Sequence, residues 1–162
     1  MSTLQITPLS PELERQLLKF FEEIDRDEYK LDFHPHPFSA EYAKKISGHT
    51  GRDLYFAVLK DSADMVGYGM LRGWDEGYEI PSIGLCILKQ FQGMGIGNLL
   101  LNFLEAVARF NECKKVMLKV RKGNNVARTL YERREYALTA YNDEFLIGIK
   151  NLTTEPGNDS RA

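Results

Sequence analysis

The sequence predicts a single mixed α/β domain, and three observations support this fold class. A chain of 162 residues, of which 43% are hydrophobic, fits one domain with one sizeable core. Two strand-like runs at residues 54–59 and 65–71 flank a polar turn, as in a β-hairpin. A further strand-like run leads through a glycine-rich turn into an amphipathic helical stretch at residues 97–110. Strands and helices therefore belong to the same domain.

The chain is predicted to open with a short strand and a helix. The strand is expected near residues 4–6. Ser10 and Pro11 are typical of a helix start, because serine caps a first turn and proline is tolerated within it. Apolar residues at helical spacing extend this helix over residues 11–25.

A loop and a second helix are predicted to follow. Pro35 and Pro37 exclude a regular helix over residues 29–38, so this stretch is predicted to be a loop. The next helix covers residues 39–46 and ends at Gly48.

The centre of the chain carries the fourth predicted strand. The hairpin leads into a loop of acidic and aromatic residues at 72–79. A strand at residues 82–89, a glycine turn at 92–97 and the helix at 97–110 then follow one another directly. The turn therefore joins the end of a strand to the start of a helix.

The last part of the chain is predicted to complete the sheet. A strand at residues 116–120 lies beside the fourth strand, since strand–helix–strand units normally make right-handed parallel crossovers. A last helix at about residues 125–135 precedes two strands, at 138–141 and 144–149. Residues 153–162 are polar and are expected to form a flexible tail behind a domain that covers residues 1–152.

The charge and the cysteine content of the chain limit the kinds of molecule that it is expected to bind. The formal net charge is −2 with both signs dispersed, so no nucleic-acid surface is predicted. Cys86 and Cys113 supply neither a disulfide framework nor metal-type spacing, which favours a cytoplasmic protein without a metal. No signal peptide or membrane span is expected. The predicted partner is a small molecule.

The glycine turn is the strongest chemical feature of the sequence. Gly93, Gly95 and Gly97 alternate where a strand meets a helix. Without side chains, backbone N–H groups can approach an anion, and the helix N-terminus adds partial positive charge. The expected ligand of this turn is a pyrophosphate group.

Two common pyrophosphate ligands fit this turn poorly. A nucleoside triphosphate site needs Lys-Ser or Lys-Thr after the last glycine, where this chain has Asn98 and Leu99. A dinucleotide site needs an acidic residue after the next strand, where Lys119 and Arg121 stand instead. Only an NADP-like variant remains open, and the glycine spacing does not match it.

Two motifs, one after the other along the chain, favour a third interpretation. Residues 92–97 read Gln-Gly-Met-Gly-Ile-Gly, which resembles the acyl-coenzyme A motif of the GNAT superfamily of N-acetyltransferases. Residues 124–133 contain Asn124, Ala127 and Leu130-Tyr131, similar to the other signature helix of that superfamily. Two departures stand out. Lys89 occupies a position where proline is common, and Glu135 stands where the signature usually has glycine.

The resemblance implies both a fold and a cosubstrate. The implied fold is a central mixed, mostly antiparallel sheet of about six to seven strands flanked by about four helices, splayed between the fourth and fifth strands. The implied cosubstrate is acetyl-CoA, gripped by the backbone of the fourth strand, the glycine turn and the last helix. The implied cosubstrate-binding residues are Ile87, Leu88, Gln92, Gly93, Met94, Gly95, Ile96, Gly97, Asn98, Asn124 and Tyr131.

Catalytic and acceptor residues are expected on the last helix and in two loops. By resemblance, Tyr131 protonates the departing sulfur of coenzyme A. Glu79 is the first candidate for the general base and Glu76 the second, because both precede the fourth strand. The residues expected to border the acceptor pocket are His34, His36, Trp74, Asp75 and Tyr78.

These features together predict an acetyl-CoA-dependent N-acetyltransferase that acts on a primary amine of a small molecule. Direct attack in a ternary complex is expected, since Cys86 has no evident activating base. Two alternatives stay open: a non-catalytic acyl-CoA-binding or regulatory module, and an NADP-binding oxidoreductase. The sequence also leaves open whether the acceptor is an amino sugar, a polyamine, an amino acid, an antibiotic or a protein N-terminus. A homodimer is one option for the oligomeric state.

Overall fold

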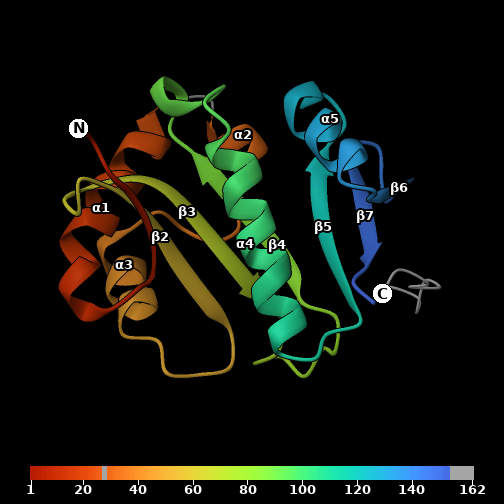
Figure 1. Cartoon of the computed structure of the whole chain (residues 1–162), viewed down its shortest axis with the longest axis horizontal. Coiled ribbons are helices and arrows are strands. Elements are labelled where there is room, and N and C mark those ends of the chain that lie inside the picture. The colour runs from red at the N-terminus through yellow and green to blue at the C-terminus, as the bar shows by residue number, and fades with distance from the viewer. Residues whose placement is uncertain (27–28, 154–162) are drawn as a thin grey trace, which may run out of the picture.

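The computed structural model describes residues 1–26 and 29–153, which are built around one seven-stranded sheet (Figure 1). The strand order is β1-β2-β3-β4-β5-β7-β6. Only β4 and β5 pair in parallel, and every other neighbouring pair is antiparallel. The predicted mixed, mostly antiparallel sheet is confirmed. The strands are β1 (Leu4–Pro8), β2 (Leu54–Lys60), β3 (Asp64–Arg72), β4 (Ser82–Ile87), β5 (Lys115–Arg121), β6 (Ala137–Ala140) and β7 (Phe145–Asn151).

Helices cover both faces of the sheet. One core packs α1 and α3 against β2, β3 and β4, and a second core packs α4 against the opposite face. Along β4, Ile83 and Ile87 belong to the α4 side while Cys86 belongs to the α1 side, as strand alternation requires. The helices are α1 (Glu14–Arg26), α2 (Tyr29–Asp32), α3 (Ala40–Ser47), α4 (Ile96–Phe110) and α5 (Asn125–Arg133), with 3₁₀ turns η1 (Pro11–Leu13) and η2 (Lys89–Phe91).

Two predicted boundaries were wrong. The loop expected over residues 29–38 begins with α2, because its prolines at 35 and 37 come after the helical turn and do not interrupt it. The fourth strand ends at Ile87, two residues earlier than expected, and η2 follows, closed by a bond from the Phe91 amide to the Leu88 carbonyl (2.8 Å). Of the predicted tail, residues 154–162 lie outside the described part of the chain.

The pairing of β4 with β5 is short. The two strands are in register only at Ser82 with Met117 and at Ile83 with Leu118. Beyond these pairs they separate toward the end of the sheet where α4 begins (Figure 1). The sheet is therefore open at the point where the glycine turn joins β4 to α4.

A buried carboxylate connects the elements on either side of this opening. Glu105 of α4 is fully buried and accepts hydrogen bonds from Arg134 (2.8 Å), Tyr136 (3.1 Å) and Lys150 (3.0 Å to Oε2). Arg134 caps the C-terminus of α5, and Lys150 lies on β7. Burial is the main cause that raises the pKa of Tyr136, and the nearby charge of Glu105 adds to it. The phenol therefore stays protonated and donates its hydrogen bond to Glu105. The cluster thus ties α4 to α5 and β7.

Removing this carboxylate is expected to destabilise the fold strongly. Glu105→Ala leaves the ammonium of Lys150 buried without a counter-ion, which should lower the free energy of unfolding by about 3–5 kcal/mol. The exposed carboxylate of Glu132, 4.0 Å from Arg128, is the matched control, and Glu132→Ala should cost less than about 1 kcal/mol. Urea denaturation compares the two, and equal losses would contradict the role given to Glu105.

The turn after α5 adopts a backbone conformation that normally favours glycine. Glu135 has φ of 67°, in the left-handed region, at the position where the superfamily signature usually carries glycine. The Tyr136 amide donates to the Tyr131 carbonyl across this turn (3.0 Å). The usual turn therefore forms despite the substitution, with backbone strain at Glu135.

Glycine at this position is expected to relieve the strain. Glu135→Gly should raise the free energy of unfolding by roughly 0.5–1 kcal/mol, because a left-handed residue with a Cβ is strained. The same change inside α5, Glu132→Gly, should lower it by about 1 kcal/mol, because glycine is a poor helix former. Thermal or urea unfolding of both variants checks the opposite signs, and a loss in Glu135→Gly would refute the argument.

Candidate active site

The opening between β4 and β5 forms a cavity of about 1260 Å³. Its walls come from β4, the glycine turn, β5, α5 and the end of α2. The glycine turn lies at one end of β4, and the loop at residues 73–81 lies at the opposite end of that strand (Figure 1). The cavity is large enough for a ligand of cofactor size.

The exposed edge of β4 offers backbone groups to this cavity. Hydrogen-bonding direction alternates along a strand, and the Leu88 amide donates to Val66 of β3 (3.0 Å). By this alternation Leu85 and Ile87 direct their backbone groups toward β5, as Pro81 does when its carbonyl accepts from Met117 (3.0 Å). No strand in residues 1–26 and 29–153 pairs with Leu85 or Ile87 on that side, so an extended ligand can do so.

This alternation corrects one of the expected contacts. Ile87 and Leu88 were both expected to pair with the pantetheine arm of coenzyme A. The Leu88 amide is bonded to β3, and its carbonyl accepts from Phe91 (2.8 Å), so neither group is available. The Ile87 carbonyl is also occupied, by Nε2 of Gln92 (2.9 Å). The groups left facing the cavity are those of Leu85 and the amide of Ile87.

The glycine turn presents unpaired amides at the end of β4. Gly93 and Gly95 have φ of 76° and 82°, and a Cβ added at either would meet open space. Within the described chain, the amides of residues 93–98 have no intramolecular hydrogen-bond acceptor. The first amide after them, that of Leu99, donates to Gly95 (3.0 Å). Since α4 begins at Ile96, these amides form the positive end of the helix, which suits a pyrophosphate.

Gln92 differs from residues 93–98 because both its amide and its side chain are bonded within the chain. Its amide donates to the Lys89 carbonyl (3.2 Å), and its side chain donates to Ile87. Gln92 therefore holds the turn against the end of β4, and its own backbone amide does not face a ligand. Met94 projects outward and is 67% exposed.

Tyr131 lies in the wall of the cavity opposite β4. The residue is on α5, is 7% exposed and packs edge-on against Tyr136, with ring centroids 5.7 Å apart. Burial, with a smaller contribution from Cys86, raises the pKa of Tyr131 to about 12. The phenol is therefore protonated at neutral pH and has a proton to give.

Two further residues of the cavity have defined roles in its geometry. Asn124 caps α5, its Oδ1 accepting from the Ala127 amide (3.1 Å), which leaves its NH₂ group to donate. Cys86 is buried, and burial raises the pKa of its thiol to about 12. Because the thiolate is the nucleophilic form of cysteine, Cys86 is unsuited to act as a nucleophile.

The acidic loop before β4 does not reach the cavity. Glu76, Tyr78 and Glu79 are exposed, and none of them lines it. The part of β4 that is paired with β5 separates this loop from the opening. With a rise of about 3.3 Å per residue, Glu79 is too far along the strand from Leu85 to meet a thioester there.

Trp74 and Asp75 of the same loop are structural in this fold. Trp74 is 8% exposed and packs in the core beneath α4. Asp75 accepts from the Arg52 amide (2.7 Å), and its carboxylate lies 2.9 Å from His49. Trp74, Asp75 and Tyr78, which were expected to border an acceptor pocket, do not line this cavity.

The two predicted histidines are separated by the structure. His36 is buried, with Nε2 2.9 Å from the Tyr68 hydroxyl and Nδ1 2.9 Å from the Pro37 carbonyl. Burial lowers its pKa to about 4, so it is neutral at physiological pH. His34 is exposed and packs edge-on against Phe38 (5.5 Å). Neither lines the cavity, and His36 instead fixes the segment that contains both.

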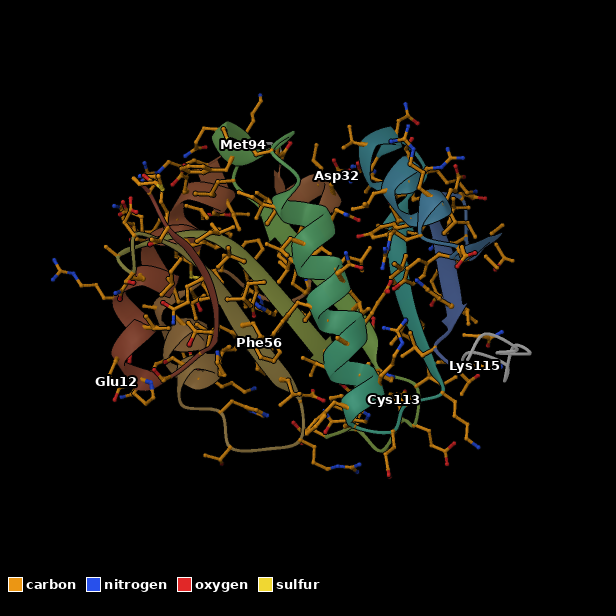
Figure 2. All side chains as sticks on the ribbon, viewed as in Figure 1. Glu12, Asp32, Phe56, Met94, Cys113 and Lys115 are labelled. Carbon is orange, nitrogen blue, oxygen red and sulfur yellow. The ribbon has the colours of Figure 1, made fainter. Side chains whose placement is uncertain are left out.

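Sequence reasoning missed three residues that line the cavity. Asp32 and Phe33 line the cavity from the end of α2, and Lys119 lines it from β5. Figure 2 shows Asp32 at the same end of the molecule as Met94 of the glycine turn. The sequence held one usable signal, an acid and an aromatic residue just before the His-Pro repeat, but long-range packing decides that they meet β4.

The described residues include neither a membrane-spanning helix nor a cluster of metal ligands. No helix in residues 1–26 and 29–153 combines the length and apolar character needed to span a bilayer. In the same part of the chain, no group of three or more His, Cys, Asp or Glu side chains is placed to hold a metal ion.

Comparisons with known proteins agree with this geometry. The model of the acetyltransferase (GNAT) family matches residues 17–136. A GNAT-family acetyltransferase from Streptococcus pneumoniae superposes with a TM-score of 0.75 at 15% identity, covering 92% of this chain and 99% of that one. The ribosomal-protein-S18-alanine N-acetyltransferase of Escherichia coli gives 0.71 at 16%, covering 96% and 98%. The PaiA N-acetyltransferase of Thermoplasma acidophilum, solved with coenzyme A, gives 0.72 at 17%, covering 92% and 99%.

The free amides of the glycine turn lead to a binding prediction. Gly95→Ala places a methyl group in the space an anion would use, and should raise the Kd for coenzyme A about tenfold, measured by calorimetry. Gly77 is a matched control, because its φ of 87° is equally left-handed, a Cβ there also meets open space, and it lies outside the cavity. Gly77→Ala should cost the same roughly 1 kcal/mol of stability but leave the Kd unchanged. Equal effects on binding would exclude the turn as the anion site.

Proposed function

Because the chain belongs to the GNAT family of acetyltransferases, we propose that it transfers the acetyl group of acetyl-CoA to a primary amine of a small molecule. One observation carries this proposal. A single cavity combines an edge of β4 without a partner strand, unpaired amides at the start of α4, and the protonated Tyr131. These are the groups that an acyl-CoA thioester requires for binding and for departure of its thiolate.

Acetyl-CoA would lie along the cavity, with each of its parts next to a different group of the protein. Its pyrophosphate would lie on the amides of residues 93–98, and its pantetheine arm would pair with the edge of β4. Two basic residues of the cavity wall, Lys89 and Arg133, complement the phosphate charge. The arm would then bring the thioester toward Leu85, between β4 and α5.

Direct attack in a ternary complex suits the residues present. The amine adds to the thioester carbonyl, and negative charge develops on the carbonyl oxygen. The backbone amides of β4 that face the cavity, those of Leu85 and Ile87, are the donors for this charge, and one such donor contributes roughly 3–4 kcal/mol. When the carbon–sulfur bond breaks, the Tyr131 hydroxyl protonates the sulfur. The thiol of Cys86 stays protonated and takes no acyl group.

The proton lost by the amine needs an acceptor. Glu79 and Glu76, the acids expected from the sequence, lie outside the cavity, whereas Asp32 is the acidic residue among those described in its wall. We assign to Asp32 the removal of this proton, directly or through water. A positioned carboxylate of this kind contributes on the order of 10²- to 10⁴-fold.

Tyr131→Phe tests the proposed chemistry. Loss of the proton donor should lower kcat by roughly 10²-fold, while the Kd for acetyl-CoA changes little. Since the pKa of Tyr131 is raised to about 12, the hydroxyl remains an acid as pH rises, and its own titration should reduce kcat only near pH 12. Release of free thiol at several pH values measures both effects.

Tyr78→Phe is the matched control, because Tyr78 is an exposed tyrosine outside the cavity, and it should retain full activity. An unchanged kcat in Tyr131→Phe would remove the proton-donor role. If neither protein binds acetyl-CoA at millimolar concentration, the transferase proposal itself fails. If acetyl-CoA binds but no amine is acetylated, the chain is a non-catalytic acyl-CoA-binding module.

A further inference from the structure

The acceptor side of the cavity carries opposite charges on its two walls. Asp32, at the end of α2, forms one wall, and Lys119 of β5 forms the other. Phe33 lies beside Asp32 in the same wall. This arrangement was not expected from the sequence, in which Asp32 and Lys119 are far apart.

Asp32 is held in place by its neighbours. Arg121 donates from the end of β5 to the Leu31 carbonyl (3.4 Å), and Arg72 of β3 donates to the Pro35 carbonyl (2.8 Å). The buried His36–Tyr68 contact fixes the same segment against the sheet. The carboxylate of Asp32 itself makes no ion pair with another described residue, so it is available to an ammonium group.

Lys119 is held in place without an anionic partner. Its neighbours Leu118 and Val120 point into the core under α4, so Lys119 projects from the opposite face, the face of α1 and α2. Its Nζ lies 4.7 Å from the ring centre of Tyr141 and 4.5 Å from that of Phe145. The two rings hold the cation by cation–π contacts, and no carboxylate of the described chain pairs with it.

This cation faces an open part of the surface. The core on the α1 side contains residues of β2, β3 and β4 but none of β5, β6 or β7. Tyr141 and Ile149, which lie on the uncovered strands and their turn, remain 57% and 41% exposed. A ligand can therefore approach Lys119 from solvent while its other end lies at Asp32.

We propose that the acceptor carries an acidic group, a carboxylate or a phosphate, in addition to its amine. The amine is held at Asp32 beside the thioester, and the acidic group is bound by Lys119. This inference rests on the proposed function and narrows its substrate class to amino acids and phosphorylated amines. A polyamine would place an ammonium group against Lys119 and be repelled.

The test uses pairs of acceptors that differ only in the acidic group. L-Amino acids are compared with their α-amides for the carboxylate arm. O-Phosphoethanolamine and glucosamine 6-phosphate are compared with ethanolamine and glucosamine for the phosphate arm. For each pair, kcat/KM is measured by thiol release, and the ratio of the acidic to the neutral member is compared between protein variants. Because the ratio is compared between variants, the intrinsic reactivity of each amine cancels.

Lys119→Gln should lower this ratio about tenfold, and Lys119→Arg should preserve it, as a charge effect requires. Lys115→Gln is the matched control. It removes a charge from the same face of the same strand, at the far end of the molecule from Asp32 (Figure 2), and should leave the ratio unchanged. Asp32→Asn should lower kcat/KM for both members of each pair, through the loss of both ammonium binding and proton removal, and leave their ratio unaltered.

Failure of the acidic-group proposal and failure of the proposed transferase function give different experimental results. If acetyl-CoA binds and an amine is acetylated, but the ratio is the same in the unaltered chain and Lys119→Gln, the acidic-group inference is overturned while the transferase stands. Preference for spermidine or for a peptide without an acidic group near its amine overturns it equally, as does acetyl-CoA binding without turnover of any acidic acceptor. Failure to bind acetyl-CoA in calorimetry rejects the function itself.

Discussion

The pairing of β4 with β5 stops after Ile83 and Leu118, and the whole candidate site depends on this early stop. Backbone groups at a strand edge need partners, and an edge inside a sheet normally finds them in the next strand. Here no described strand pairs with Leu85 or Ile87 on the β5 side, and only the Ile87 carbonyl is occupied, by Gln92, so the fold keeps a template for an extended ligand. The glycine turn, Tyr131 and Asp32 are useful because each lies beside that edge.

Most of the fold was predictable because local signals agreed with the tertiary structure. The hairpin, the helix after the glycine turn and the parallel crossover rest on periodicity and turn residues, and all three were confirmed. The family resemblance and its cosubstrate also agree with the comparisons, because the two motifs are short and contiguous. Short helices escape such reasoning: the single turn of α2 has too few residues to establish a period.

The other residues that line the cavity were predicted less well, for a physical reason. Proximity to β4 in sequence placed Glu79 near the thioester, but a strand carries its two ends apart, and the loop lies at the wrong end. Trp74 and Asp75 looked like binding residues because they are aromatic and acidic, yet one packs in the core and the other holds backbone amides. Asp32 and Lys119 line the same cavity only because of the sheet topology, which no local pattern reveals.

The anchoring of the segment around His36 has a consequence for how substrates are distinguished. Arg72, Arg121 and Tyr68 hold this wall from strands that form whether or not a ligand is present. These contacts are intramolecular, so they pre-organise the described segment from Leu31 to His36 against the sheet. Under the proposed function, a wall bonded to the sheet in this way favours acceptors that match its shape, because its residues would have to give up these hydrogen bonds to rearrange.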